Sequence, residues 1–98
     1  MDSYKLVRLY ANIDQNIIIR STHAQDLGII LADLKRIFPA AKVKSLQFPD
    51  GNVYGFDIEK LKNECDSAHW WVIQQLSKNG YEPFGTVQGG EYSFRIKA

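Results

Sequence analysis

The sequence is poor in cysteine, with Cys65 the single one among 98 residues. One thiol cannot form a disulfide within the chain, so nothing in the sequence requires an oxidising environment. The first residues, Met1 to Tyr4, have neither the basic cluster nor the apolar run of a secretory signal. We therefore expect a reducing, cytoplasmic location.

Long apolar runs and a surplus of one charge are also missing. The unbroken apolar runs are only a few residues long, whereas a helix that spans a bilayer needs about 20 such residues. The 12 Lys and Arg residues face 11 Asp and Glu residues, so no overall field attracts nucleic acid or an anionic membrane. We expect no membrane partner, and any affinity for nucleic acid must come from a local patch.

Motifs that would carry chemistry are incomplete. Cys65 and His69 have the spacing of a metal pair on a helix, but no CxxC and no second such pair completes a tetrahedral set. The same two residues lack a third group that would orient a nucleophile and its base. Gly89 and Gly90 lie between two expected strands instead of before a helix, so they predict a turn and not a phosphate loop. We predict no catalytic residue, no metal site and no cofactor, and therefore no enzyme.

What the sequence does contain is the composition of an ordinary globular domain, with 45% hydrophobic and 23% charged residues. Its length suits a single domain over residues 1–98 with one two-layer core.

The residue patterns predict three pairs of strands and two helices. The strand pairs are residues 4–11 with 17–19, residues 42–48 with 53–56 around a turn at 49–52, and residues 81–87 with 91–97. Thr22 and Gln25 form a capping box for a first helix that ends near Ile37. The second helix begins near Asp57 and ends before Gly80, which provides a left-handed cap.

The order ββαββαββ predicts an α+β fold: a two-layer sandwich in which a mostly antiparallel sheet carries both helices on one face. Strands two to five, with the helices between them, follow the β-α-β-β-α-β order of ferredoxin-like domains. The first and last strands are then expected as extra edge strands.

Two adjacent tryptophans, Trp70 and Trp71, fall on the second helix, whose apolar stripe can bury one of them well. The other ring should lie at the flank of the stripe, where tryptophan commonly anchors a protein interface, together with Tyr81 and Tyr92 if they are near. The alternative is that both indole rings pack in the core.

Basic residues gather on the expected strands, and a sheet face lined by them could track a phosphate backbone. The residues concerned are Arg8, Arg20, Lys44, Arg95 and Lys97. Tyr54 and Phe56 flank Gly55 in a pattern that partly resembles the longer motif of RNA-recognition motifs, whose aromatics stack on bases. The basic residue, the glycine and the apolar residue that the family has around these aromatics are absent. In the alternative interpretation the two aromatics belong to the core, and the basic residues protect exposed strands from aggregation.

The segment from Trp71 to Phe84, followed by Tyr92–Arg95, resembles the end of a widespread family of short bacterial domains of unknown function. The shared features are a leucine-bearing helix, a glycine, an aromatic–glutamate pair and a final hairpin, and the opening Tyr4–Arg8 is similar too. The resemblance implies no activity, but it favours a small adaptor or regulatory domain over an enzyme.

The sequence thus predicts a non-enzymatic binding or adaptor module that acts through protein contacts, with another protein or as a homodimer. Trp70, Trp71 and Tyr81 are the expected contact residues. The alternative is a nucleic-acid-binding domain that uses the basic sheet face.

Overall fold

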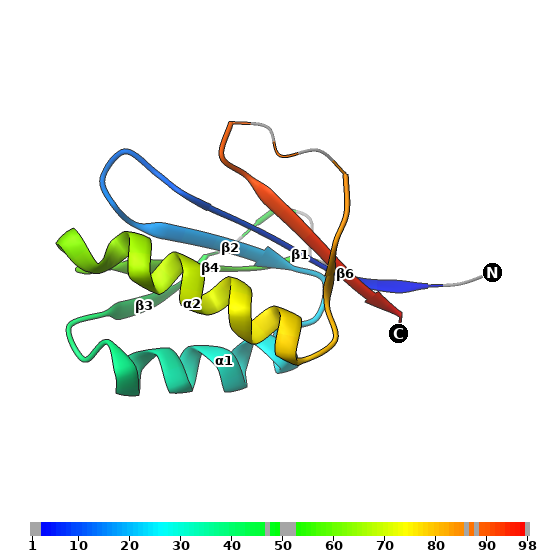
Figure 1. Ribbon diagram of the computed structural model, residues 1–98, viewed down its shortest axis with the longest axis horizontal. Helices are drawn as coiled ribbons and strands as arrows, with labels where there is room; N and C mark the ends of the chain where they lie inside the picture. The colour runs from blue at the N-terminus through cyan, green and yellow to red at the C-terminus, as the bar shows by residue number, and fades with distance from the viewer. Residues whose placement is uncertain (1–2, 47, 50–52, 86, 88, 98) are drawn as a thin grey trace.

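The computed structural model of the protein describes residues 3–46, 48–49, 53–85, 87 and 89–97. The strands are β1 (Tyr4–Ala11), β2 (Ile17–Ser21), β3 (Lys42–Leu46), β4 (Tyr54–Glu59), β5 (Glu82–Pro83) and β6 (Tyr92–Lys97). The helices are α1 (Ala24–Ile37) and α2 (Cys65–Lys78), and a short 3-10 turn, η1 (Lys62–Glu64), precedes α2. Within these residues the strands form one six-stranded antiparallel sheet, and both helices lie against the same face of it (Figure 1). The prediction of an α+β fold with a mostly antiparallel sheet and two helices is confirmed.

The predicted ferredoxin-like strand order, however, is wrong. That order would place β5 beside β2, whereas the observed order is β3-β4-β2-β1-β6-β5, with β1 and β6 inside the sheet. The turn at residues 12–16 keeps β1 next to β2, because Asn12 Oδ1 accepts hydrogen bonds from the backbone N–H groups of Asp14 and Asn16. On its other side β1 pairs with β6 along residues 4–9, and β5, with two residues, is left at the edge.

The core lies between the sheet and the two helices. Alternate residues of the central strands face the helices, so Val7 and Leu9 of β1 are fully buried, as are Ile17 and Ile19 of β2. The helices contribute fully buried residues in return, among them Leu27, Leu34, Ala68, Val72 and Leu76. Each buried Leu or Ile side chain stabilises the fold by about 1.5–3 kcal/mol relative to its exposed state.

The second helix starts later than the sequence pattern predicts. Residues 57–59 continue β4 instead of starting the helix, and Ile58 pairs with Ile17 in the middle of the sheet. Ile58, Leu61 and Cys65 are spaced as on a helix, but this spacing arises from a strand, a connection and the first residue of α2. At the other end of α2 the prediction is confirmed, since Gly80 has a φ of 90° and follows the last turn.

The first helix begins at Ala24, and the predicted capping box is absent from it. His23 is the N-cap residue, and it makes no side-chain hydrogen bond to the helix. Thr22 Oγ1 instead accepts a hydrogen bond of 3.0 Å from the backbone N–H of Leu6, so this side chain ties the start of the helix to β1. In the second strand pair, residues 50–52 of the predicted turn lie outside the described residues. Neither helix of the described chain is long and apolar enough to span a membrane.

Candidate functional site

Of the three residues expected at a protein interface, the structure leaves one well exposed. Trp70 is 51% exposed, whereas Tyr81 is buried at 4%. Trp71 is half-buried and packs edge-on against Phe38, with ring centroids 6.4 Å apart. Because successive residues of a helix point about 100° apart, the neighbouring tryptophans necessarily face different surroundings. Tyr81 belongs to the core and not to a contact surface.

Trp70 forms part of the wall of a cleft of about 370 Å³, which we call the Trp70 cleft. Three segments meet there: the turn between β1 and β2, the stretch from η1 into the first turns of α2, and the turn that leads into β6. Its lining includes Gln15, Lys62, Asp66, His69, Trp70 and Tyr92. The cleft therefore combines aromatic rings with groups of both charges.

The aromatic part of the cleft is a cluster of three rings in mutual contact. The centroid of the His69 ring lies 5.3 Å from that of Tyr92 and 6.3 Å from that of Trp70. Trp70 and Tyr92 are themselves 6.3 Å apart, and the planes of all three pairs are inclined by 60–85°. Such edge-to-face contacts hold rings in place, so the exposed indole has neighbours on two sides.

His69 is the buried polar residue of this cleft. It is 7% exposed, and its Nε2 atom has no hydrogen-bond partner among the described residues. Burial lowers the pKa of the imidazole, while the nearby Asp66 carboxylate acts in the opposite direction. The ring is therefore neutral at pH 7, and its nitrogen is a hydrogen-bonding position that the protein itself does not use.

Cys65 lies next to His69 in the lining of the cleft, as their spacing predicts. Burial raises the pKa of the Cys65 thiol, so it stays protonated at neutral pH, in the less reactive form. No group of three or more His, Cys, Asp or Glu side chains that could hold a metal ion occurs in the described ranges. The pair thus has neither an activated nucleophile nor a completed ligand set.

The backbone around this end of the molecule is unusual. Gln15, Lys60 and Lys62 have φ angles of 62°, 67° and 52°, and no other non-glycine residue in the described chain has a positive φ. This conformation is rare outside glycine and costs free energy, and it often marks functional segments. Gln15 and Lys62 line the Trp70 cleft, and with Lys60 they also line the shallower hollow beside it.

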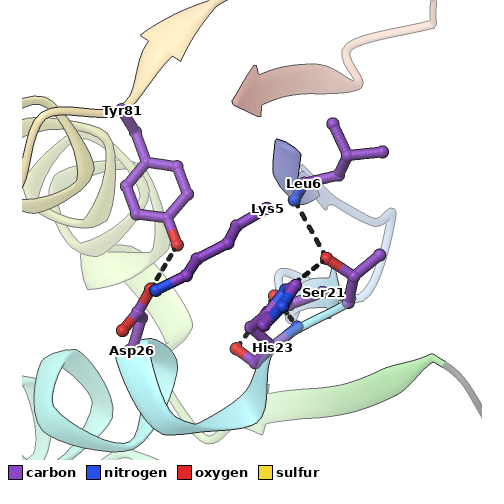
Figure 2. Close-up of polar contacts among 7 residues, drawn as sticks. Lys5, Leu6, Ser21, His23, Asp26 and Tyr81 are labelled. Atoms are coloured by element: carbon purple, nitrogen blue, oxygen red, sulfur yellow. Dashed lines mark hydrogen bonds and ion pairs between the residues drawn. The ribbon is translucent and has the colours of Figure 1, made fainter. Parts of the chain in front are cut away.

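A second cluster of polar residues lies at the start of α1 (Figure 2). The Tyr81 hydroxyl donates a hydrogen bond of 2.7 Å to Asp26 Oδ2, and Lys5 Nζ lies 3.3 Å from the same oxygen. The hydrogen bond from Tyr81 lowers the pKa of Asp26 most, and Lys5 lowers it further. Burial and the bond to Asp26 raise the pKa of Tyr81, which remains a neutral phenol. These contacts join β1, α1 and the segment after α2, so the cluster supports the fold.

The remaining residues of Figure 2 fix the chain where it passes from β2 into α1. Ser21 Oγ accepts a hydrogen bond from the backbone N–H of His23 at 3.0 Å, and Ser21 Oγ is 3.1 Å from the His23 carbonyl oxygen. The Thr22 hydroxyl, which braces β1, also contacts His23 Nδ1 at 2.8 Å. The hydroxyl and imidazole groups of this segment therefore serve local backbone geometry.

Most of the predicted basic residues lie on the sheet face opposite the helices, paired with carboxylates. Arg8 and Arg20 face each other across β1 and β2. Glu91 Oε1 lies 4.0 Å from Nη1 of Arg8, and Glu91 Oε2 lies 2.6 Å from Nη2 of Arg20. Lys44 pairs with Glu59 at 3.1 Å.

Two further predicted basic residues come from β6. Arg95 pairs with Glu82 at 3.2 Å, and its guanidinium carbon lies 4.8 Å from the Tyr4 ring centroid and 5.4 Å from that of Phe84. Lys97 is exposed near the end of β6, opposite Tyr4. The carboxylates of this face offset much of the positive charge expected from the sequence.

Tyr54 and Phe56 do not share that face. Phe56 stands opposite Ile19 and Tyr54 opposite Ser21, both buried residues of the helix-covered side of β2. Phe56 packs against the core, while Tyr54, at the end of β4, is 47% exposed. The structure therefore does not bring the two aromatics and the basic residues together on one surface.

Sequence reasoning missed several residues of the Trp70 cleft. Gln15, Lys62 and Asp66 come from segments that meet only in the folded chain, and no local pattern connects them with Trp70. The positive φ angles at Gln15 and Lys62 also have no signal in the sequence, because the residues involved are not glycine.

Comparison of the chain with models of protein families, with curated proteins and with solved structures finds no match.

Proposed function

We propose that the protein is a small, non-enzymatic binding module that contacts a partner protein through the Trp70 cleft. The observation that carries the proposal is the half-exposed Trp70 ring, held against His69 and Tyr92 at the edge of a cleft. Tryptophan is enriched among the residues that dominate binding energy at protein interfaces, above all where neighbouring groups exclude water around it.

The size of the cleft favours a short segment of the partner over a folded surface. Its volume of about 370 Å³ is near the lower end of the range of ligand pockets, about 300–1,000 Å³. Ile13, which is 97% exposed, lies on the turn between β1 and β2 whose neighbouring residues line the cleft. A peptide that inserts one side chain can cover this apolar side chain as well.

Two further points support this class of function. The thiol of Cys65 and the imidazole of His69 are both neutral, so the thiol is not activated as a thiolate, which argues against nucleophilic catalysis. The resemblance of the C-terminal segment to short bacterial domains of unknown function favours an adaptor. The nucleic-acid alternative has less support, because ion pairs with Glu91, Glu59 and Glu82 already engage Arg20, Lys44 and Arg95 on the sheet face.

Selection from a displayed library of random peptides tests the proposal. Selected peptides should bind the wild-type chain and lose most of their affinity for Trp70→Ala. Ile29→Ala is the matched control, since Ile29 is a large apolar side chain, 74% exposed on α1, that does not line the cleft. Amide chemical shifts in the complex should change around the β1–β2 turn and the start of α2.

Other outcomes would contradict the proposal. Peptides that bind Trp70→Ala as well as the wild type, or that shift resonances on the opposite sheet face, place recognition elsewhere. Sedimentation equilibrium examines self-association: a dimer that persists in Trp70→Ala would assign the partner role to a second copy and to another surface.

A further inference from the structure

The Trp70 cleft is lined by Trp70 and Tyr92, whose rings are of the kind that attract cations. A guanidinium or ammonium group within about 6 Å of a Trp or Tyr ring centroid is drawn to the negative face of the ring. This protein already holds one guanidinium in that way, because Arg95 lies against the rings of Tyr4 and Phe84. In the cleft the rings of Trp70 and Tyr92 are inclined by 62°, so their faces are directed differently.

The same cleft contains a carboxylate that forms no ion pair with the described part of the chain. Asp66, in the first turn of α2, is exposed and makes no hydrogen bond or ion pair with any side chain of the described residues. By contrast, Asp26, Glu59 and Glu91 all pair with basic side chains of this chain. Lys62 is the other charged residue of the lining, and its exposed, flexible side chain can turn toward solvent.

His69 supplies an acceptor between these groups. The imidazole is neutral and so does not repel a cation, and in the tautomer that carries its proton on Nδ1 the Nε2 atom accepts a hydrogen bond. Nε2 is buried and has no hydrogen-bond partner among the described residues, which is rare for a buried polar atom in a native protein. His69 lines the cleft, and its ring centroid lies 6.3 Å from that of the half-exposed Trp70.

We infer that the Trp70 cleft binds the guanidinium group of an arginine side chain of the partner, stacked on Trp70 and paired with Asp66, with His69 as an additional hydrogen-bond acceptor. A guanidinium is planar, stacks on aromatic rings, and carries five N–H donors in a fixed arrangement, whereas an ammonium is a compact and strongly hydrated charge. The inference rests on the proposed function, because it names the group that the partner segment inserts.

The test uses two small probes of nearly the same shape. N-acetyl-arginine methylamide carries the guanidinium, and N-acetyl-citrulline methylamide replaces it with a neutral urea. Titration of each into the full chain, followed by the indole N–H resonance of Trp70 and the ring resonances of His69, should give binding about tenfold weaker for the citrulline probe, equivalent to about 1.4 kcal/mol. The corresponding lysine probe should also bind more weakly than arginine.

Two variants separate the charge from the fold. Asp66→Asn should remove most of the difference between the arginine and citrulline probes and shift the unfolding curve only slightly, because Asp66 is an exposed side chain whose loss of charge affects only the first turn of α2. Glu64→Gln, an exposed residue just before α2 that does not line the cleft, should keep the difference.

Equal binding of the two probes, or loss of the difference in both variants, would overturn the arginine inference. Library peptides without arginine that still bind at Trp70 would do the same while leaving the proposed function standing. If neither probe nor any selected peptide shifts the resonances of the cleft, both proposals fail.

Discussion

Replacement of Tyr81 by Phe is expected to destabilise the fold without affecting a binding surface. Tyr81 is 4% exposed, and its hydroxyl donates a 2.7 Å hydrogen bond to the Asp26 carboxylate. A hydrogen bond to a charged group contributes about 1.5–3 kcal/mol to stability. The Asp26 side chain is 35% exposed and keeps its contact with Lys5, so water can replace part of the lost bond. We therefore expect a loss of about 1–2 kcal/mol in the free energy of unfolding for Tyr81→Phe.

The pH dependence of this loss is a stricter test of the cause. Because the hydrogen bond lowers the folded-state pKa of Asp26, its stabilisation is present above the unfolded pKa of about 4 and is lost as the pH falls through the folded pKa. Urea unfolding followed by tryptophan fluorescence should therefore show the full difference between wild type and Tyr81→Phe at pH 7 and a smaller one near pH 3. Equal stability of the two proteins at pH 7, or a difference that does not change with pH, would refute the reasoning.

Three further predictions concern residues around the Trp70 cleft. Trp71→Ala, at a half-buried ring that packs on Phe38, should cost about 2–4 kcal/mol in urea unfolding, whereas Trp70→Ala should cost less than about 1 kcal/mol. Lys60→Gly should leave the free energy of unfolding unchanged or raise it by up to about 0.5 kcal/mol, because glycine adopts the observed φ of 67° without strain. The control Gln74→Gly, at an exposed position within α2, should lower the free energy of unfolding by about 1 kcal/mol. Burial lowers the folded-state pKa of His69, so protonation favours the unfolded chain, and stability should decline as the pH falls below about 6.5. Unfolding curves at pH 7.5 and 5.5 should differ more for the wild type than for a His69→Gln variant, and equal differences would assign the pH effect to other groups.

The sequence allowed prediction of those elements whose residues keep one pattern from end to end. Leu27, Leu34 and Phe38 follow the helical period, and the helix over residues 24–37 ends just before Phe38, which precedes Pro39. The paired strands of residues 42–46 and 54–56 could likewise be predicted from their β-forming residues, although β4 continues to Glu59. The start of the second helix was not, because Ile58 and Leu61 have the spacing of a helical stripe although Ile58 lies in β4 and Leu61 in the connection that follows it.

Strand order could not be derived from local patterns. Whether β1 or β5 lies beside β2 depends on pairings between residues that are distant in sequence, such as Val7 with Phe94. The ferredoxin-like hypothesis used the order of elements along the chain and not the lengths of the strands. Since β5 has only two residues, it offers few backbone hydrogen bonds to a neighbouring strand. The longer β1 therefore lies beside β2, and β6 pairs with the other side of β1.

The candidate site was only partly accessible to sequence reasoning, for a related physical reason. The pair of tryptophans indicated that one ring lies outside the core. Which of the two rings is exposed, however, depends on the rotation of α2 against the sheet. Tyr81 was expected at a protein interface together with the exposed tryptophan, yet its hydroxyl donates a hydrogen bond to the Asp26 carboxylate 55 positions away and its ring is buried.

The backbone strain beside the Trp70 cleft connects its shape with the proposed use of the site. At Gly80, Gly85, Gly89 and Gly90 the chain uses glycine for positive φ angles, as conformational preference dictates. At Gln15, Lys60 and Lys62 it adopts the same region with side chains that lack this freedom. Glycine would relieve the strain at each position, but it would remove the Gln15 and Lys62 side chains from the lining of the cleft. We therefore propose that the fixed course of the two segments beside the cleft, more than the side chain of any one of these residues, is what binding of a partner requires.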